Sequence, residues 1–116
     1  MSRNKPIDWI GSSLKDLSDD EIFPEAARRA AGYQLRKVQR GDDPDDWKPF
    51  DDVGAGTKEI RIKQTDGAFR VMYVAKFEDV IYVLHCFKKK TQKTSQKDRD
   101  LSTQRYKDMM LTRSKK

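Results

Sequence analysis

The sequence predicts an α+β fold in which two N-terminal helices pack on an antiparallel β-sheet and a further helix ends the chain. Residues 24–40 carry apolar side chains at helical spacing, and residues 59–87 contain three segments with a strand-like pattern. The short connections between these segments favour an antiparallel meander. The apolar face of such a sheet must be covered by helices. A chain of 116 residues is expected to form one domain, residues 1–116.

Three elements are expected before the meander. Residues 6–10 alternate apolar and polar side chains and stop at a glycine, which indicates a short strand. Residues 14–17 follow two serines and are expected to form a short helix with a serine as its N-cap. The main helix is expected to begin near Pro24, whose missing N–H costs nothing in a first turn, and to end at Gly41. Its apolar stripe consists of Phe23, Ala27, Ala31, Leu35 and Val38.

The strands of the meander are expected at residues 59–63, 69–76 and 80–87, with a hairpin turn at residues 65–67. The third strand is nearly continuous in apolar residues, so we expect it to be the central strand, covered on both faces. One face of the sheet is expected to lie under helices and the other to carry polar side chains. Residues 97–110 are weakly helical and are expected to close over the sheet or to dock on a partner. Residues 111–116 are expected to form a mobile tail.

Composition excludes several classes of site. The single cysteine, Cys86, permits no intramolecular disulfide, indicates a reducing compartment and is expected to be an inert core residue. One histidine and one cysteine cannot form a His/Cys zinc site, so no metal and no cofactor are expected. The longest apolar run, residues 80–87, is too short to cross a bilayer, and no secretory signal is visible. We therefore expect a cytoplasmic protein without membrane contact. The segment Gly54–Lys58 lacks the spacing of a phosphate-binding loop and is expected to be a turn.

Charge is unevenly distributed along the chain. Residues 1–56 contain 9 basic and 12 acidic residues, a net charge of −3, whereas residues 57–116 contain 16 and 7, a net charge of +9. A basic half on a small chain indicates a surface that faces a polyanion. The lysines at 88–90 adjoin a predicted strand, so we assign them to that surface rather than to a frayed tail.

Residues that could carry chemistry gather on the meander. Glu59, Arg61 and Lys63 share one face of a strand because side chains alternate, and Arg70 and residues 85–90 can come near them. Aromatic residues interleave with these cations: Phe69, Tyr73, Tyr82 and Phe87. Cations beside aromatic rings suit phosphate capture and base stacking, as in proteins that bind RNA. A solvated charged face is an alternative of equal weight.

A series of motifs runs through the chain in a fixed order. They lie at residues 9–17 and 32–41, at the strand 57–63, at Phe-Arg-Val-x-Tyr in 69–73, and at Tyr-Val-Leu-His-x-Phe-x-Lys-Lys in 82–90. Together they cover residues 5–110 and resemble the RelE/ParE superfamily of toxins, most closely its HigB-like, phage-related branch. The resemblance implies a compact RelE-like fold of the microbial-RNase type.

The resemblance also implies a toxin of a type II toxin–antitoxin system. Such a toxin is a metal-independent endoribonuclease that cuts mRNA in the ribosomal A site and blocks translation. The implied partners are the ribosome, mRNA and a cognate helix-turn-helix antitoxin of the HigA type, which holds the toxin inactive in a hetero-oligomer. In metal-free cleavage the ribose 2′-hydroxyl attacks the adjacent phosphate. That step needs the hydroxyl deprotonated, the phosphorane charge offset and the 5′-oxygen protonated.

The resemblance assigns roles to particular residues. Arg61 and Arg70 match strand positions of the family and are expected to bind the phosphate and offset the transition-state charge. His85 titrates near neutral pH and is a candidate general base or acid, with a core histidine as an equal alternative. Tyr73 is a candidate for orienting the nucleotide, although sheet packing is favoured, and Glu59 is a candidate base, although an exposed strand carboxylate is favoured. The residues expected to contact RNA are Lys63, Lys88, Lys89, Lys90 and Lys93.

Two alternatives belong to other functional classes. The first is a ParE-like inhibitor of DNA gyrase without nuclease activity, because the ParE branch keeps the fold and acts on gyrase. The converging cations favour the nuclease over this alternative. The second is a non-toxic, phage-derived protein that binds nucleic acid.

Overall fold

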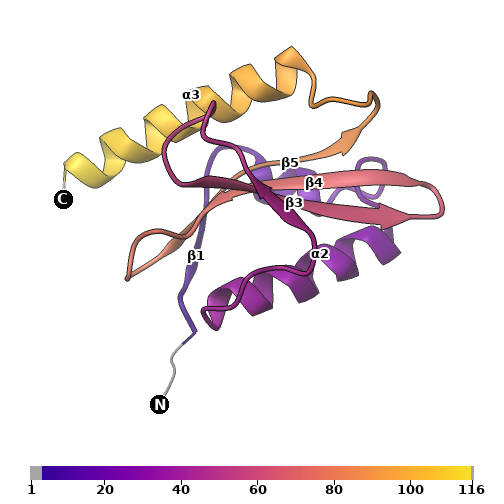
Figure 1. Ribbon diagram of the computed structural model, residues 1–116, viewed down its shortest axis with the longest axis horizontal. Coiled ribbons are helices and arrows are strands. Elements are labelled where there is room, and N and C mark those ends of the chain that lie inside the picture. Colours follow the sequence, from indigo (N-terminus) through magenta and orange to yellow (C-terminus); the bar gives the residue numbers. More distant parts are fainter. Residues whose placement is uncertain (1–3, 116) are drawn as a thin grey trace.

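The computed structural model describes residues 4–115 and contains one five-stranded sheet and three helices, which confirms the α+β class. The helix α2 lies on one side of the sheet and α3 on the other (Figure 1). In chain order the elements are β1 (Ile7–Trp9), α1 (Ser13–Leu17), α2 (Glu25–Gln39), β2 (Trp47–Pro49), β3 (Thr57–Gln64), β4 (Gly67–Val74), β5 (Ile81–Lys89) and α3 (Gln96–Ser114).

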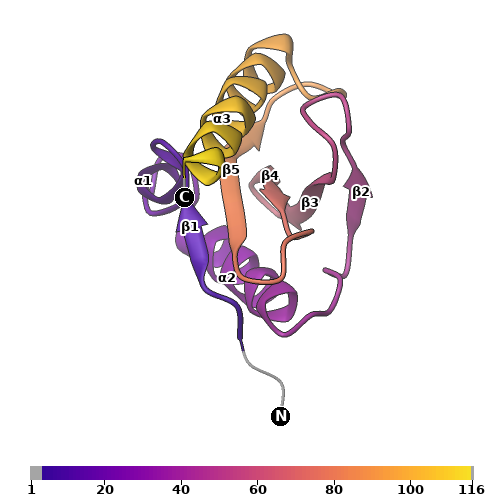
Figure 2. The same ribbon diagram turned by 90° about the vertical axis from the view of Figure 1, so that its left-hand side faces the viewer.

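The strand order across the sheet is β1-β5-β4-β3-β2. The strands β3 to β5 form the expected antiparallel meander, and β2 pairs antiparallel with β3 beyond it. The strand β1 instead pairs with β5 in parallel, with Ile7 opposite Ile81 (Figure 2). The sheet is therefore mixed at one edge. The expectation that the third meander strand is central was wrong, because only β1 lies outside β5 while β3 and β2 both lie beyond β4. The strand β5 is nevertheless buried on both faces from Ile81 to Phe87.

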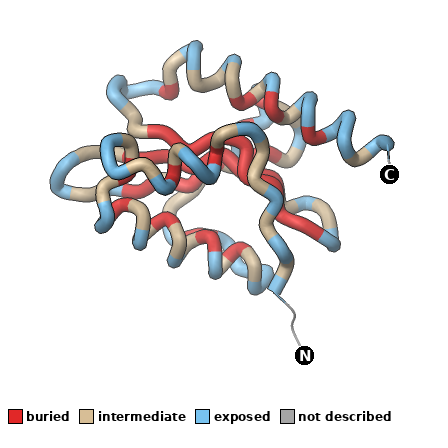
Figure 3. Tube along the Cα trace, turned by 180° about the vertical axis from the view of Figure 1, so that it is seen from behind, coloured by how far each residue is buried: buried red, intermediate tan, exposed pale blue. Residues whose placement is uncertain are grey.

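The helix α2 packs against one face of the sheet along the predicted stripe. Its buried residues are Ala27, Ala31, Leu35 and Val38. They join Ile60 and Ile62 of β3 in one core cluster, and Leu17 at the end of α1 extends it. The small side chains of the two alanines let the helix approach the strands closely. Figure 3 shows buried positions at intervals along α2 and along the strands that it covers.

The other sheet face carries a second core as well as polar residues. Met109 of α3 is fully buried there, and Tyr106 packs beside it. Their sheet partners are apolar side chains of β4 and β5, together with Phe50 and Val53 of the loop before β3. The expectation of a polar face thus holds only beyond the reach of α3, toward the strand ends that carry Arg61, Arg70 and Lys89.

Several local features differ from the sequence-based expectation. The strand β2 was not expected, and it adds an edge strand because Trp47 and Lys48 alternate faces opposite Ile60 and Glu59. Ser12 occupies the N-cap position of α1, but its hydroxyl donates to the Asp16 carboxylate rather than capping the backbone. The helix α3 continues through Ser114, into the segment expected to be a tail.

Within that segment Arg113 donates to the Tyr82 hydroxyl at 2.9 Å and contacts Asp79. Residue 116 lies outside the described range. The expected turn at Gly54 has a packing role, because a Cβ there would lie 2.5 Å from the Tyr106 ring. No helix within residues 4–115 is long and apolar enough to cross a membrane.

We expect opposite effects from adding a methyl group at two glycines. Gly32 lies inside α2, and a Cβ there would meet no atom within 4 Å. The change Gly32→Ala should stabilise the protein by about 0.5–1 kcal/mol, because glycine is a poor helix former. The change Gly54→Ala should destabilise it because of the clash with Tyr106. Urea titration of both variants checks the pair, and a Gly32→Ala variant less stable than wild type would contradict the argument.

Candidate nucleic-acid interface

Four cations from four adjacent strands share one face of the sheet. In the strand register Arg61 of β3 lies opposite Arg70 of β4, and Lys48 of β2 lies opposite Glu59. Lys89 stands two residues beyond Phe87, the β5 partner of Arg70, and therefore points to the same face. This basic cluster, consisting of Lys48, Arg61, Arg70 and Lys89, lies on the α3 side of the sheet.

Glu59 is the buried anion at the centre of the basic cluster. Its side chain is 0% exposed, and its Oε2 accepts a hydrogen bond of 2.8 Å from the Thr94 hydroxyl. Its Oε1 lies 3.6 Å from Nε of Arg70 and 3.9 Å from Nζ of Lys48. The expectation of an exposed strand carboxylate was wrong, because the segment that leads into α3 folds over this position. A buried carboxylate of this kind is retained when it is paired with cations.

Arg70 is held rigidly and yet keeps an unsatisfied donor. Its side chain is 6% exposed, and one of its terminal nitrogens donates to the Phe69 carbonyl at 2.9 Å. Its Nε is buried and has no hydrogen-bond partner. Burial lowers the pKa of Arg70, and Glu59 opposes that shift. The guanidinium remains charged at neutral pH because its ordinary pKa lies far above it, so it can serve as a fixed positive charge.

Arg61 is the more accessible arginine of the pair. Its side chain is 39% exposed, and its guanidinium binds the Asp46 carboxylate at 3.0 Å. Asp46 is itself half exposed, and an ion pair in that setting contributes little to stability. An incoming anion can therefore replace Asp46 at low cost.

His85 is buried in a chain of polar contacts that ties α3 to the sheet. Its Nε2 lies 2.8 Å from the Asp98 carboxylate, and its ring stacks on Phe87 with centroids 4.6 Å apart. Its Nδ1 lies 3.5 Å from a guanidinium nitrogen of Arg105, which also donates to the Leu84 carbonyl at 2.9 Å. Burial lowers the pKa of His85, and the Asp98 hydrogen bond opposes that shift. With both ring nitrogens occupied, His85 is suited to hold position rather than to exchange protons with a ligand.

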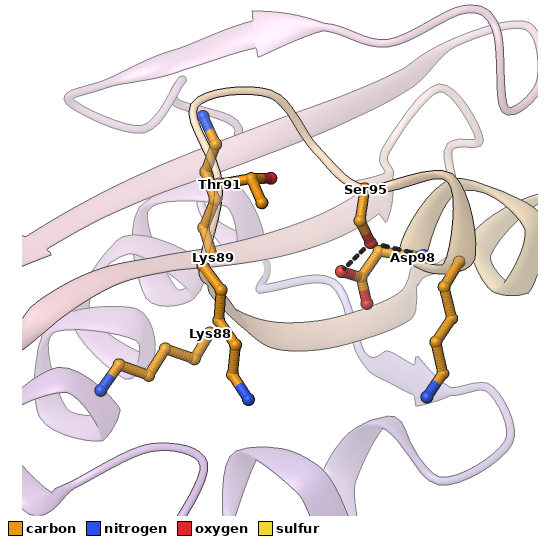
Figure 4. Close-up of a pocket in the computed structure, with 7 residues that line it drawn as sticks. Lys88, Lys89, Thr91, Ser95 and Asp98 are labelled. Atoms are coloured by element: carbon orange, nitrogen blue, oxygen red, sulfur yellow. Dashed lines mark hydrogen bonds between the residues drawn. The ribbon is translucent and has the colours of Figure 1, made fainter.

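The first turn of α3 is fixed by a cap. Ser95 accepts a hydrogen bond from the Asp98 backbone N–H at 3.1 Å and donates to the Asp98 carboxylate at 2.7 Å. This contact orients Asp98 toward His85 and starts the helix beside the basic cluster. A cavity of about 260 Å³ opens next to it, with Lys88 and Lys89 on one side and Ser95 and Asp98 on the other (Figure 4). The remaining lining residues are Lys90, Thr91 and Lys97.

Burial and the nearby Arg70 both lower the pKa of Lys89. The cavity presents the ammonium groups of its lysines beside the N-terminus of α3, an arrangement that attracts anions.

The structure brings some of the predicted site residues together and separates others. Arg61, Arg70 and Lys89 are neighbours, and Lys63 continues the same face toward the end of β3. Lys88 lines the cavity as well, and its ammonium lies 5.8 Å from the Phe69 ring centroid. Lys90 lines the cavity, whereas Lys93 is exposed in the loop beyond it.

Tyr73 is a core residue and does not belong to the basic cluster. It is 1% exposed in the core beneath α2, on the opposite face of the sheet from Arg70. Burial raises its pKa well above the ordinary value, and the same holds for Cys86, which is buried as expected. Both environments are those of core residues.

Three contributors to the site escaped the sequence analysis: Lys48, Thr94 and Asp98. The alternation around Lys48 was readable as a strand but is only three residues long. Ser95 followed by Asp98 has the spacing of a helix cap, and this signal predicts where α3 begins. Nothing in the sequence indicates that Thr94 reaches Glu59, because the two residues are 35 positions apart.

The lowered pKa of His85 predicts a pH-dependent stability. Because the folded protein binds a proton at His85 less readily than the unfolded chain, its contribution to stability is present above pH ~6.5 and is lost as the pH falls below that value. The loss approaches about 1.4 kcal/mol per pH unit for one proton. Since His85 is the only histidine, His85→Gln should flatten the profile of unfolding free energy between pH 5.5 and 7.5. Urea titrations across this range check the prediction, and an unchanged slope in the variant would refute it.

Comparison with known proteins places the chain in a family. Residues 19–107 match the family described as Phage derived protein Gp49-like (DUF891). The match includes α2, the whole meander, the basic cluster and most of α3. A search of curated proteins found no match. The chain belongs to the Gp49-like phage-derived family, a RelE/ParE-like family of toxins in toxin–antitoxin systems.

Proposed function

We propose that this protein is a HigB-like toxin that cuts mRNA in the ribosomal A site and so blocks translation. The observation that carries the proposal is the basic cluster. In it Arg61 and Arg70 lie opposite each other on the neighbouring strands β3 and β4, with Lys89 of β5 on the same face. Converging cations are what the trigonal-bipyramidal phosphorane of RNA cleavage requires. A protein that only binds gyrase has no need of them. The proposed fold is RelE-like, with α2 and α3 on opposite faces of the sheet.

The roles follow from exposure and charge. Arg61 is accessible and binds the scissile phosphate by displacing Asp46, while the fixed charge of Arg70 offsets the charge that develops behind it. Lys89, which lies on the same sheet face as Arg61 and Arg70, is the ammonium group placed to protonate the 5′-oxygen, and burial lowers its pKa. We give His85 a positioning role, since Asp98 and Arg105 occupy its ring. The lysines of the cavity then hold neighbouring phosphates of mRNA or ribosomal RNA.

The proposal includes a partner and a place of action. In this family context the toxin has an antitoxin as its partner. We propose a helix-turn-helix antitoxin of the HigA type, which neutralises the toxin in a hetero-oligomer. The toxin acts in the cytoplasm, where it meets the ribosome and mRNA.

Mapping of RNA ends in induced cells tests the proposed activity directly. Primer extension should reveal new 5′ ends at fixed positions within codons soon after induction, and these ends should vanish when the neighbouring gene is co-expressed. A DNA-damage response with intact mRNA would support gyrase inhibition instead. Normal growth on induction, without new ends, would favour a non-toxic nucleic-acid-binding protein.

We expect the arginine pair to be essential for cleavage. Loss of a charge-assisted contact at the phosphorane typically costs about 2–4 kcal/mol of transition-state stabilisation, or roughly 30- to 1,000-fold in rate. Both Arg61→Ala and Arg70→Gln should show losses in this range in a ribosome cleavage assay. Arg113→Ala, which removes an arginine from the distant end of the sheet, should cleave normally. Because Arg61 is exposed, its variant should keep the wild-type melting temperature, and a fully active, folded Arg61→Ala protein would remove it from the site.

The lysines at the end of β5 should control the salt dependence of ribosome binding. Each contact with a phosphate releases about one counterion, so the triple change of Lys88, Lys89 and Lys90 to alanine should lower the log–log salt slope by roughly 2–3 units. A control that replaces the exposed Lys15, Lys107 and Lys115 should leave the slope near that of wild type. Co-sedimentation with ribosomes across a salt series measures both slopes. Parallel curves for wild type and the β5 variant would exclude these lysines from RNA contact.

A further inference from the structure

The outer face of α2 carries a second, separate group of cations. Arg28, Arg29 and Arg36 surround a shallow, open hollow along α2, together with Glu25 and Gly32, which we call the arginine groove. This arginine groove points away from the sheet, because the opposite side of α2 supplies the buried stripe. It lies on the other side of the molecule from the basic cluster, which shares the sheet face of α3 (Figure 1).

Gly32 lies at the bottom of the arginine groove, and no close contact within the described residues requires a glycine there. It lies in the middle of a 15-residue helix, where glycine is unfavourable, and a Cβ would meet nothing within 4 Å. Its φ is not in the left-handed range. The missing side chain leaves a flat position between Arg29 and Arg36, at which another backbone can approach α2 closely.

The arginines of the groove are available to a partner. Within residues 4–115 Arg36 makes no salt bridge, and Arg29 pairs only with Glu25, at 2.7 Å, with both side chains more than two-thirds exposed. Arg28 binds Asp20 at 2.7 Å, again at the surface. Exposed pairs of this kind contribute little and exchange readily for a better carboxylate. Tyr33, which is 52% exposed, stands beside them, and arginine and tyrosine are the residue types that dominate protein interfaces.

We propose that the arginine groove docks an acidic helix of the antitoxin. Arg29 and Arg36 are seven residues apart, which places them two turns and about 10.5 Å apart along α2. A partner helix with carboxylates at the same seven-residue spacing meets both guanidinium groups while its backbone passes over Gly32. Arginine pairs with carboxylates in bidentate geometry.

Nucleic acid fits the arginine groove less well. A phosphate backbone carries a charge at every nucleotide, and Glu25 at the head of the groove repels that continuous charge. A helix can instead place an uncharged residue at that point. The acidic helix is therefore the occupant that the charge pattern favours.

The inference rests on the antitoxin partner of the proposed function but not on its nuclease chemistry. An antitoxin helix bound to α2 leaves Arg61, Arg70 and the lysine cavity uncovered. Binding of the antitoxin to α2 is then a separate contact from any that the antitoxin makes with the basic cluster.

The test measures the affinity of the full-length toxin for the protein encoded by the neighbouring gene, by calorimetry. Two variants alter the groove: Arg36→Glu reverses its free charge, and Gly32→Gln fills its floor. Both should weaken antitoxin binding by about tenfold or more, since like charges and lost contacts each cost an interface this much. Gly32→Gln should at the same time raise the melting temperature of the free toxin, so weaker binding cannot be ascribed to unfolding. Lys15→Glu, a charge reversal on the exposed side of α1, is the matched control and should bind as wild type does.

The outcomes separate the possibilities. The proposal would be overturned if both variants bound the neighbouring gene's protein as tightly as wild type does. It would also be overturned if that protein did not bind the wild-type toxin. Weaker ribosome co-sedimentation of Arg36→Glu with normal antitoxin binding would overturn it in favour of an RNA contact on α2. A toxin that loses antitoxin through these changes but never cuts RNA would refute the nuclease alone, whereas one that cuts RNA and keeps its antitoxin affinity would refute the arginine groove alone.

Discussion

The pairing of Glu59 with its surrounding cations is the interaction on which the candidate site depends. Arg61 and Arg70 lie directly opposite each other in the strand register, and like charges in that position repel. The buried carboxylate of Glu59, with Asp46 at the rim, offsets this repulsion and holds Arg70 in place. The segment before α3 seals the arrangement through Thr94. The cations are therefore positioned before any ligand arrives, and a ligand need not supply the energy to gather them.

A buried histidine links α3 to the sheet through polar contacts. His85 links Asp98 on α3 with Arg105, and Arg105 in turn donates to Ser12 beside α1 at 2.7 Å. Three elements distant in sequence are thus joined by polar contacts at one level of the sheet. Their satisfied donors and acceptors make the arrangement specific, because any shift of α3 would leave one of these groups buried without a partner. The apolar contacts of Met109 stabilise the packing of α3 on the sheet, and the polar contacts fix its position along the sheet.

Much of this fold followed from residue patterns, whereas the site depended on contacts between distant residues. The stripe of α2 and the strand patterns of β3 to β5 are local signals, and both were predicted correctly. Which strands pair, and which strand lies at an edge, is not set by local pattern. The parallel pairing of β1 with β5 makes β4 the central strand, and the sequence does not indicate that Ile7 would join the β5 edge. Glu59 was misjudged for the same reason, since its strand looks solvent-exposed until Thr94 covers it. Arg61 and Arg70 were expected to lie close together because both lie on the strands that define the pattern, and the structure places them opposite each other.

The order in which the polypeptide is made gives the Thr94 seal a further meaning. Synthesis proceeds from the N-terminus, and Thr94, Ser95 and Asp98 lie in the last quarter of the chain. A nascent chain that already contains α2 and the cationic strands still lacks the residues that cover Glu59 and fix His85. Contacts between positions so far apart in sequence also form slowly. The cationic centre is therefore complete only when the segment before α3 and the first turn of α3 have joined the sheet, because these supply Thr94 to Glu59 and Asp98 to His85.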